Sequence, residues 1–120
     1  MEKILLIEDE PMMAELYKDG FSKAGFRVFV AFNSKDGLKI AKKEKPDLIV
    51  LDILLPAEDG IVFLKKYKKF PEISSIPVIV FSNYDLPDVK KEALGLGVKE
   101  YLLKTNFTPL QLIDKVKEYL

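Results

Sequence analysis

The sequence predicts an α/β fold in which a parallel sheet carries helices on both faces. Three observations lead to this prediction. Strand-like and helix-like segments alternate about five times along the 120 residues, the joints between them are short, and three of the strand-like runs are apolar throughout. A strand that is apolar on both faces belongs in the interior of a parallel sheet covered by helices. We therefore expect residues 1–120 to form one domain without an internal linker.

Composition limits the chemistry that this chain can perform. It has no cysteine and no histidine, so disulfides, zinc-thiolate sites, thiol nucleophiles and imidazole bases are excluded. Nineteen Lys and Arg residues balance nineteen Asp and Glu residues, and we expect no direct contact with nucleic acid. The apolar runs are too short to span a bilayer and the first residues lack a signal-peptide pattern. We expect no membrane contact and a cytoplasmic location.

Two strand and helix pairs are assigned in the first part of the chain. Lys3–Glu8 is an apolar strand with an acidic end, and the helix after it starts with a proline and closes at Gly25. Arg27–Phe32 alternates as a second strand, and Asn33 is placed to cap a helix over Ser34–Glu44. The residues expected on the buried faces of these helices are Met13, Tyr17, Phe21, Ala24, Leu38 and Ala41.

The third strand contains a continuous apolar run, Leu48–Leu51. Asp47–Leu51 is expected to be buried on both faces and to carry Asp52 at its carboxyl end, followed by a turn through Pro56 and Gly60. The next helix has an inner side of Ile61, Phe63, Leu64 and Tyr67 and an outer side of Lys65, Lys66, Lys68 and Lys69. We interpret these lysines as a solvated helix face rather than as a partner or phosphate patch.

The last part of the chain repeats the pattern twice. Val78–Phe81 is a second fully apolar strand, and Pro87 opens a short helix that the Gly95-Leu96-Gly97 segment stops. Lys99–Leu103 is the fifth strand. Thr108-Pro109-Leu110-Gln111 then combines a cap, a proline and a capping-box glutamine. We expect the helix that follows to run to the end of the chain with Leu112, Ile113, Val116 and Leu120 on its apolar side.

Together these elements predict a doubly wound (βα)5 flavodoxin-like fold, a three-layer sandwich around a parallel five-stranded sheet in the order 2-1-3-4-5. The three apolar runs become central strands. The two mixed runs, Arg27–Phe32 and Lys99–Leu103, become the edges of the sheet.

Polar residues follow four of the strands at the edge where an open α/β sheet binds its ligands. Glu8 and Asp9 follow the first strand, Asp52 the third, Ser82 the fourth and Lys104 the fifth. Carboxylates gathered there repel one another by roughly 1–4 kcal/mol per pair at about 4 Å, so a positive charge is needed. A hard cation with oxygen ligands, Mg²⁺, fits this set, and Lys104 adds a point charge.

This set of groups is suited to phosphoryl transfer, in which catalysis is mostly positioning and charge neutralisation. Asp52 is a carboxylate nucleophile that could form an acyl phosphate, while Lys104 and Ser82 hold phosphoryl oxygens. No histidine is required, because a carboxylate is already a nucleophile at neutral pH.

Over essentially its whole length the chain resembles a response-regulator receiver domain of two-component signalling. The residues that carry the resemblance are Glu8-Asp9, Leu51-Asp52-Ile53-Leu54-Leu55-Pro56, Asp59-Gly60, Ser82, and Lys104 preceded by Tyr101.

The resemblance implies a phospho-acceptor role for Asp52, which would take a phosphoryl group from the phosphohistidine of a separate sensor histidine kinase. It also implies that Asp9 ligates Mg²⁺ directly and Glu8 through water, with Asp52 and the backbone carbonyl of Leu54 completing the protein ligands. Such a domain catalyses only its own phosphorylation and dephosphorylation, and is otherwise not an enzyme.

The resemblance further implies that Ser82 and Tyr101 form a switch pair, a hydroxyl that moves toward the phosphoryl group and an aromatic ring that rotates inward behind it. The surface of the fourth helix, fifth strand and fifth helix would carry the change outward. A homodimer through this surface is left open, as are the kinase, the output domain or downstream protein, and whether the chain works alone or within a longer protein.

Several positions depart from the common family pattern. Glu8 stands where Asp is frequent, Asn83 where a small residue is usual, and Thr105 where proline is typical. Leu54 and Tyr84 lie where side chains tend to govern how water reaches the acyl phosphate. Because one is apolar and the other bulky, we expect slow hydrolysis.

Other functions remain open beside the phospho-acceptor. Each site residue taken alone has a structural interpretation as a cap or a solvated group, but four strand ends carrying the required types together favour a site. A flavodoxin-like cofactor binder is disfavoured because Glu8-Asp9-Glu10-Pro11 repels phosphate. A phosphohydrolase would want a second carboxylate at Leu54. An interaction domain that keeps this fold but works without phosphorylation is the main alternative.

Overall fold

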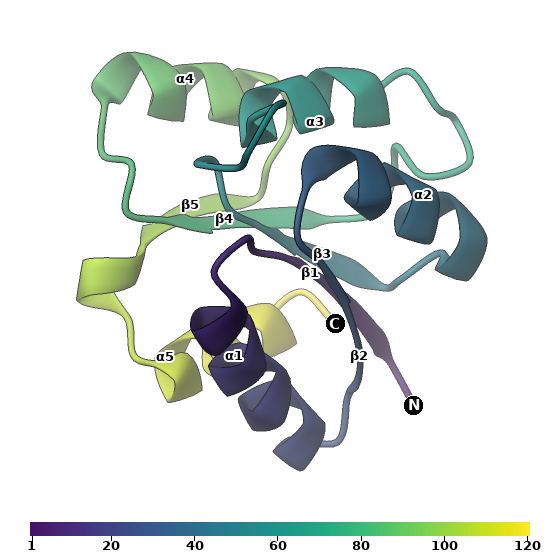
Figure 1. Ribbon diagram of the computed structural model, residues 1–120, viewed down its shortest axis with the longest axis vertical. Coiled ribbons are helices and arrows are strands. Elements are labelled where there is room, and N and C mark those ends of the chain that lie inside the picture. Colours follow the sequence, from purple (N-terminus) through teal and green to yellow (C-terminus); the bar gives the residue numbers. More distant parts are fainter.

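The computed structural model describes residues 1–120 and has the predicted architecture (Figure 1). Five parallel strands form one sheet in the order β2-β1-β3-β4-β5, so the doubly wound fold and the two edge positions are confirmed. The strands are β1 (Lys3–Ile7), β2 (Arg27–Ala31), β3 (Leu48–Leu51), β4 (Val78–Ser82) and β5 (Glu100–Leu103).

Five helices cover the sheet, two on one face and three on the other (Figure 1). Helices α1 and α5 lie on one face, and α2, α3 and α4 lie on the opposite face. None of the helices combines the length and the apolar character needed to cross a membrane. Their bounds are α1 (Pro11–Lys23), α2 (Ser34–Glu44), α3 (Gly60–Tyr67), α4 (Pro87–Gly95) and α5 (Pro109–Lys117).

The side chains of β1 show why the sheet needs both layers. Ile4 and Leu6 pack under α1 and α5, whereas Leu5 and Ile7 pack under α2 and α3, and all four are at most 2% exposed. Successive side chains of a strand point to opposite faces, so an apolar run must be covered on both sides. Because the central strands are held on both faces, the residues at their carboxyl ends are held in place at one edge of the sheet.

Three of the helices, α2, α3 and α5, begin at a side-chain cap, whereas α1 and α4 begin with a proline and no side-chain cap. The side chain of Asn33 accepts a hydrogen bond from the backbone N–H of Asp36 at 2.8 Å, as predicted for the start of α2. Thr108 and Gln111 form the predicted capping box at the start of α5. These caps satisfy N–H groups that a helix start leaves free, so the joints can stay short.

Two predictions for buried helix residues are wrong. Leu120 was expected inside, but α5 ends at Lys117 and the Leu120 side chain, outside the helical register, is 38% exposed. Ala24 was also expected to face the core, and it is exposed because it lies at the C-cap of α1. There the chain turns toward β2 through Gly25, whose φ of +98° favours glycine. Periodicity alone does not locate the last turn of a helix.

Candidate functional site

A pocket of about 350 Å³ lies at the carboxyl edge of the sheet, and the predicted metal and phospho-acceptor residues line it. Strands β1 and β3 are neighbours, and β4 lies next to β3, so the residues that follow these strands meet at one place. The lining consists of Glu8, Asp9, Glu10, Met13, Asp52, Leu54, Asn83 and Lys104.

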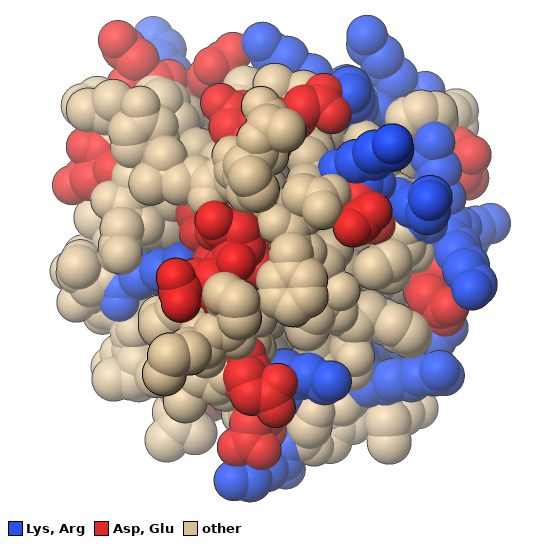
Figure 2. All heavy atoms as spheres, viewed as in Figure 1, with Lys and Arg blue, Asp and Glu red and all other residues tan.

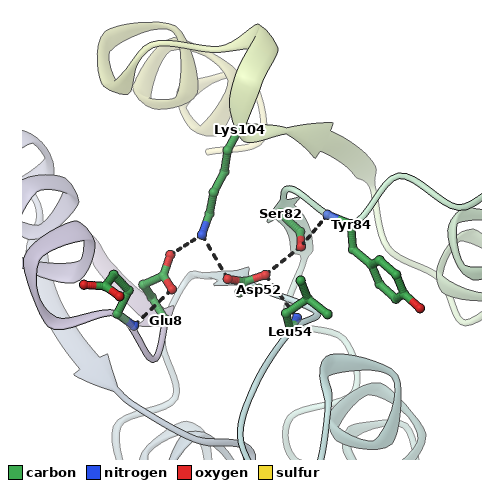
Figure 3. A network of polar contacts seen from close by, with 7 residues as sticks. Glu8, Asp52, Leu54, Ser82, Tyr84 and Lys104 are labelled. Atoms are coloured by element: carbon green, nitrogen blue, oxygen red, sulfur yellow. Dashed lines mark hydrogen bonds and ion pairs between the residues drawn. The ribbon is translucent and has the colours of Figure 1, made fainter.

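Asp52 is the centre of the polar network in this pocket (Figure 3). Its side chain is buried, and its Oδ1 accepts hydrogen bonds from the Ser82 hydroxyl at 2.6 Å and from the backbone N–H of Leu54 at 3.2 Å. Its Oδ2 accepts a hydrogen bond from Lys104 Nζ at 2.9 Å. Both carboxylate oxygens are therefore held by donors, which fixes the orientation of the side chain.

Lys104 joins the carboxylates of two neighbouring strands. Its Nζ donates to Glu8 Oε1 as well as to Asp52 Oδ2, and its side chain is only 10% exposed. Burial by itself lowers the pKa of Lys104, but the hydrogen bonds to Glu8 and Asp52 outweigh it and raise that pKa above its usual value. Burial also raises the pKa of Glu8, although the contacts with Lys104 oppose this.

Three carboxylates gather closely enough to share one ion. Ligand oxygens of Glu8, Asp9 and Asp52 lie within 4.8 Å of one another, with Glu8 and Asp52 buried and Asp9 exposed. A set made only of oxygen donors suits a hard divalent cation. Lys104 contacts two of the three carboxylates and leaves the cluster with a net negative charge, so the donor set fits Mg²⁺.

Ser82 and Tyr101, the predicted switch pair, are connected through the backbone of Tyr84. The Tyr84 N–H donates to Ser82 Oγ at 3.2 Å, and the Tyr101 hydroxyl donates to the Tyr84 carbonyl at 2.5 Å. The Tyr101 side chain lies inward, 8% exposed, and burial raises its pKa to about 12. The sequence did not indicate this connection, because the linking groups are the backbone amide and carbonyl that every residue carries.

The positions that depart from the family pattern also lie at or near this pocket. Asn83 is one of the lining residues of the pocket. Thr105 belongs to a short 3₁₀ helix, Lys104–Asn106, directly after β5. Its side chain is exposed, so the turn keeps Lys104 directed toward the carboxylates while Thr105 faces solvent.

Gly60 holds the turn after Asp52, and we predict that Gly60→Ala disturbs it. A Cβ at this position would lie 2.6 Å from the backbone oxygen of Asp52 and 2.8 Å from Ile53 Cα. Backbone atoms cannot yield as a flexible side chain does, so the free energy of unfolding should fall by about 1–3 kcal/mol in a urea titration. Gly95→Ala is the matched control, because a Cβ there meets nothing within 4 Å. Equal stability of the Gly60 variant and the wild type would contradict this prediction.

Two curated relatives match almost the whole chain. The chain is 37% identical over 119 residues to sporulation initiation phosphotransferase F of Bacillus subtilis, covering 99% of this chain and 94% of the relative. It is 34% identical over 119 residues to the alkaline phosphatase synthesis transcriptional regulatory protein PhoP of the same organism. That match covers 99% of this chain but only 48% of the relative, so the chain spans about half of its length.

Solved structures show the same architecture. The Francisella response regulator 1452 receiver domain superposes with a TM-score of 0.88 at 34% identity, covering 99% of this chain and 96% of that one. Chemotaxis protein CheY4 of Vibrio cholerae superposes with a TM-score of 0.92, covering 100% and 99% of the two chains, and at 24% identity this likeness concerns the fold alone. The family model of the response regulator receiver domain matches residues 4–117. The chain therefore belongs to the response regulator receiver domain family of two-component signalling.

Proposed function

We propose that this receiver domain is a cytoplasmic phospho-acceptor that takes a phosphoryl group from the phosphohistidine of a sensor histidine kinase onto Asp52 in a Mg²⁺-dependent reaction. One observation carries the proposal. A buried carboxylate at the end of a central strand is held by Lys104, by Ser82 and by a backbone N–H, beside two further carboxylates. The family membership supports the same role.

The transfer requires only one side chain of this domain to react. A carboxylate oxygen of Asp52 attacks phosphorus, the P–N bond to the kinase histidine breaks, and the imidazole leaves with the bonding electron pair. Lys104 and Ser82 already lie within hydrogen-bond distance of Asp52, at 2.9 and 2.6 Å, so they are placed to donate to phosphoryl oxygens. The domain acts on its own aspartate and turns over no other substrate.

The metal would be held by Glu8, Asp9, Asp52 and the backbone carbonyl of Leu54. Bound there, Mg²⁺ would neutralise negative charge on the phosphoryl oxygens. The chain contributes the pocket itself, with Asp9 at its exposed rim and Glu8 and Asp52 buried behind it. Lys104 forms an ion pair with each of the two buried carboxylates, so it compensates part of their negative charge whether or not an ion is present.

Phosphorylation would reach the α4-β5-α5 surface through Ser82 and Tyr101. A phosphoryl group on Asp52 would accept the hydrogen bond that the Ser82 hydroxyl now donates to Asp52. The same hydroxyl oxygen accepts a hydrogen bond from the Tyr84 N–H. A shift of the Tyr84 backbone then moves the Tyr84 carbonyl, which accepts the hydrogen bond of the Tyr101 hydroxyl. Because Tyr101 lies on β5, the change reaches that strand. This surface would address an output domain, a downstream protein or a second copy of the chain.

Exposed apolar side chains support a protein partner near the pocket. Met12 and Leu16 on α1 are 80% and 51% exposed, and Leu110 at the start of α5 is 74% exposed. Helices α1 and α5 pack against each other (Figure 1). Met12 and Leu16 lie four residues apart on α1 and so are neighbours on its surface. Exposed apolar groups that lie together mark interaction surfaces, which fits a kinase that must bring its phosphohistidine to Asp52.

The experiment that tests this function is phosphorylation by acetyl phosphate, followed by phosphate-affinity electrophoresis. We expect a slower band with Mg²⁺ and none with a chelator. Asp9→Asn should need more Mg²⁺ for the same yield, whereas Glu15→Gln on the exposed face of α1 should behave as wild type. Equal yields with and without the metal would reject the Mg²⁺-dependent reaction, and no slower band under either condition would favour a domain that works without phosphorylation.

We predict that the acyl phosphate hydrolyses slowly. Leu54 lines the pocket with its side chain 51% exposed, and Tyr84 lies beside Ser82, so neither position offers a carboxylate or amide to orient water. Loss of radiolabel from the purified phosphoprotein should take many minutes or longer. Leu54→Asn should shorten this lifetime by about tenfold or more, and Leu86→Asn, an exposed leucine outside the pocket lining, should not. A wild-type lifetime of seconds would refute the prediction.

A further inference from the structure

A second pocket, of about 600 Å³, lies between α2 and α3 on the other side of the β3-α3 turn. We call it the lysine groove. Figure 2 shows basic side chains gathered on the side of the molecule where Figure 1 places α2, while acidic side chains gather near the middle of the same view. The chain as a whole is neutral, so this positive charge is a local excess. The groove is lined by Lys35, Leu38, Lys39, Lys42, Lys43, Glu58 and Lys66.

The positive charge of the groove is largely uncompensated. Its single carboxylate, on Glu58, is already paired with Lys66. None of the four lysines that α2 contributes takes part in any ion pair of the structure. Only Lys42 has a fixed contact, with its Nζ 3.4 Å from the centre of the Phe70 ring. The remaining ammonium groups are free to meet an anion.

Helix stability explains only part of this arrangement. Lys42 and Lys43 lie in the last turn of α2, where positive charge is favourable. Lys35 lies in the first turn, at the positive end of the helix dipole, and Lys39 lies between them. Lys35, Lys39 and Lys43 also repeat at four-residue spacing, which places like charges next to one another and destabilises a helix. Lys35 and Lys39 therefore destabilise the helix, so a solvated helix face is an incomplete explanation for them.

We propose that the lysine groove binds an extended acidic segment of a partner protein. The α2 helix has 11 residues and is about 16 Å long. Lysines four residues apart on a helix are separated by about 6 Å along its axis, and alternate side chains of an extended chain by about 6.6 Å. Lys35, Lys39 and Lys43 can thus face alternate carboxylates of one strand-like peptide, with buried Leu38 at the base of the groove.

Other anionic surfaces fit less well. Insertion into a membrane needs exposed apolar side chains beside the charges, and none of the exposed large apolar residues belongs to α2 or α3. Single-stranded nucleic acid is held by stacking on aromatic rings. The aromatic ring at this groove, Phe70, already carries the Lys42 ammonium over its face.

The test is to mix residues 1–120 with a labelled peptide of alternating Glu and Ser and to measure its fluorescence anisotropy. The wild type should bind it, and salt at about 1 M, where screening acts within about 3 Å, should abolish binding. Lys35→Glu with Lys39→Glu should weaken binding by about tenfold or more. The first change also places an acidic residue at the helix start, so this variant should fold at least as well. Lys68→Glu with Lys99→Glu makes the same charge change at exposed lysines outside the groove and should bind nearly as wild type.

Each alternative outcome overturns the proposal. It fails if the groove variant binds as the wild type does, or if the control variant loses as much affinity. It also fails if duplex DNA or phosphatidylserine vesicles bind the wild type more tightly than the peptide does. Asp52→Ala leaves the groove intact and should not change peptide binding, so the result is independent of the phospho-acceptor function.

Discussion

Replacement of Lys104 by glutamine is expected to lower the free energy of unfolding by about 3–5 kcal/mol at neutral pH without divalent cations. Lys104 is the one basic residue in contact with Glu8 and Asp52, and both carboxylates are nearly inaccessible to water. Glutamine keeps much of the side-chain volume but removes the charge, which leaves two buried carboxylates facing each other. Urea denaturation in a chelating buffer measures this loss.

Magnesium and a control variant make the measurement specific. Added Mg²⁺ should restore much of the stability of Lys104→Gln, because it brings positive charge back to the same carboxylates. Lys115→Gln removes a lysine that pairs with Glu100 at 3.4 Å and is 33% exposed, and it should cost less than about 1 kcal/mol. If the Lys104 variant were as stable as the Lys115 variant without metal, the pocket would not need its positive charge.

The pH dependence of Lys104→Gln gives a second readout. Burial raises the pKa of Glu8 above 4.5 in the folded state, and the variant loses the Lys104 contacts that oppose this. A carboxyl group with a raised folded-state pKa binds its proton more tightly when folded, so stability falls as pH rises from about 4.5 through the raised value. The difference in the free energy of unfolding between the variant and the wild type should therefore be small in acid and reach its full size at neutral pH.

Much of the site was predictable because it depends on strand ends. In a parallel sheet the carboxyl ends of neighbouring strands share one edge, so residues at or just after the ends of β1, β3, β4 and β5 had to come together once the strand order was known. Side-chain type then indicated the chemistry, and the structure places Asp52 within hydrogen-bond distance of both Ser82 and Lys104.

What the sequence did not indicate depends on contacts between elements. The route from Ser82 to Tyr101 runs through the backbone of Tyr84, which leaves no trace in residue type. The lysine groove joins α2 residues to Lys66 on α3, and only the packing of the two helices brings them together. The lysines of α3 taken alone indicated no more than a solvated face.

Asp52 is the residue on which the proposed function depends most, and its modification can be located directly. After treatment with acetyl phosphate and Mg²⁺, borohydride reduction converts an aspartyl phosphate to homoserine, which peptide mass spectrometry assigns to one position. We expect homoserine at position 52 in the wild type, and no phosphoryl adduct on intact Asp52→Ala, which has lost the nucleophile. An adduct that survives in Asp52→Ala would contradict the account. So would, in the wild type, homoserine at position 9 or the reduction product of a glutamyl phosphate, 2-amino-5-hydroxypentanoate, at position 8.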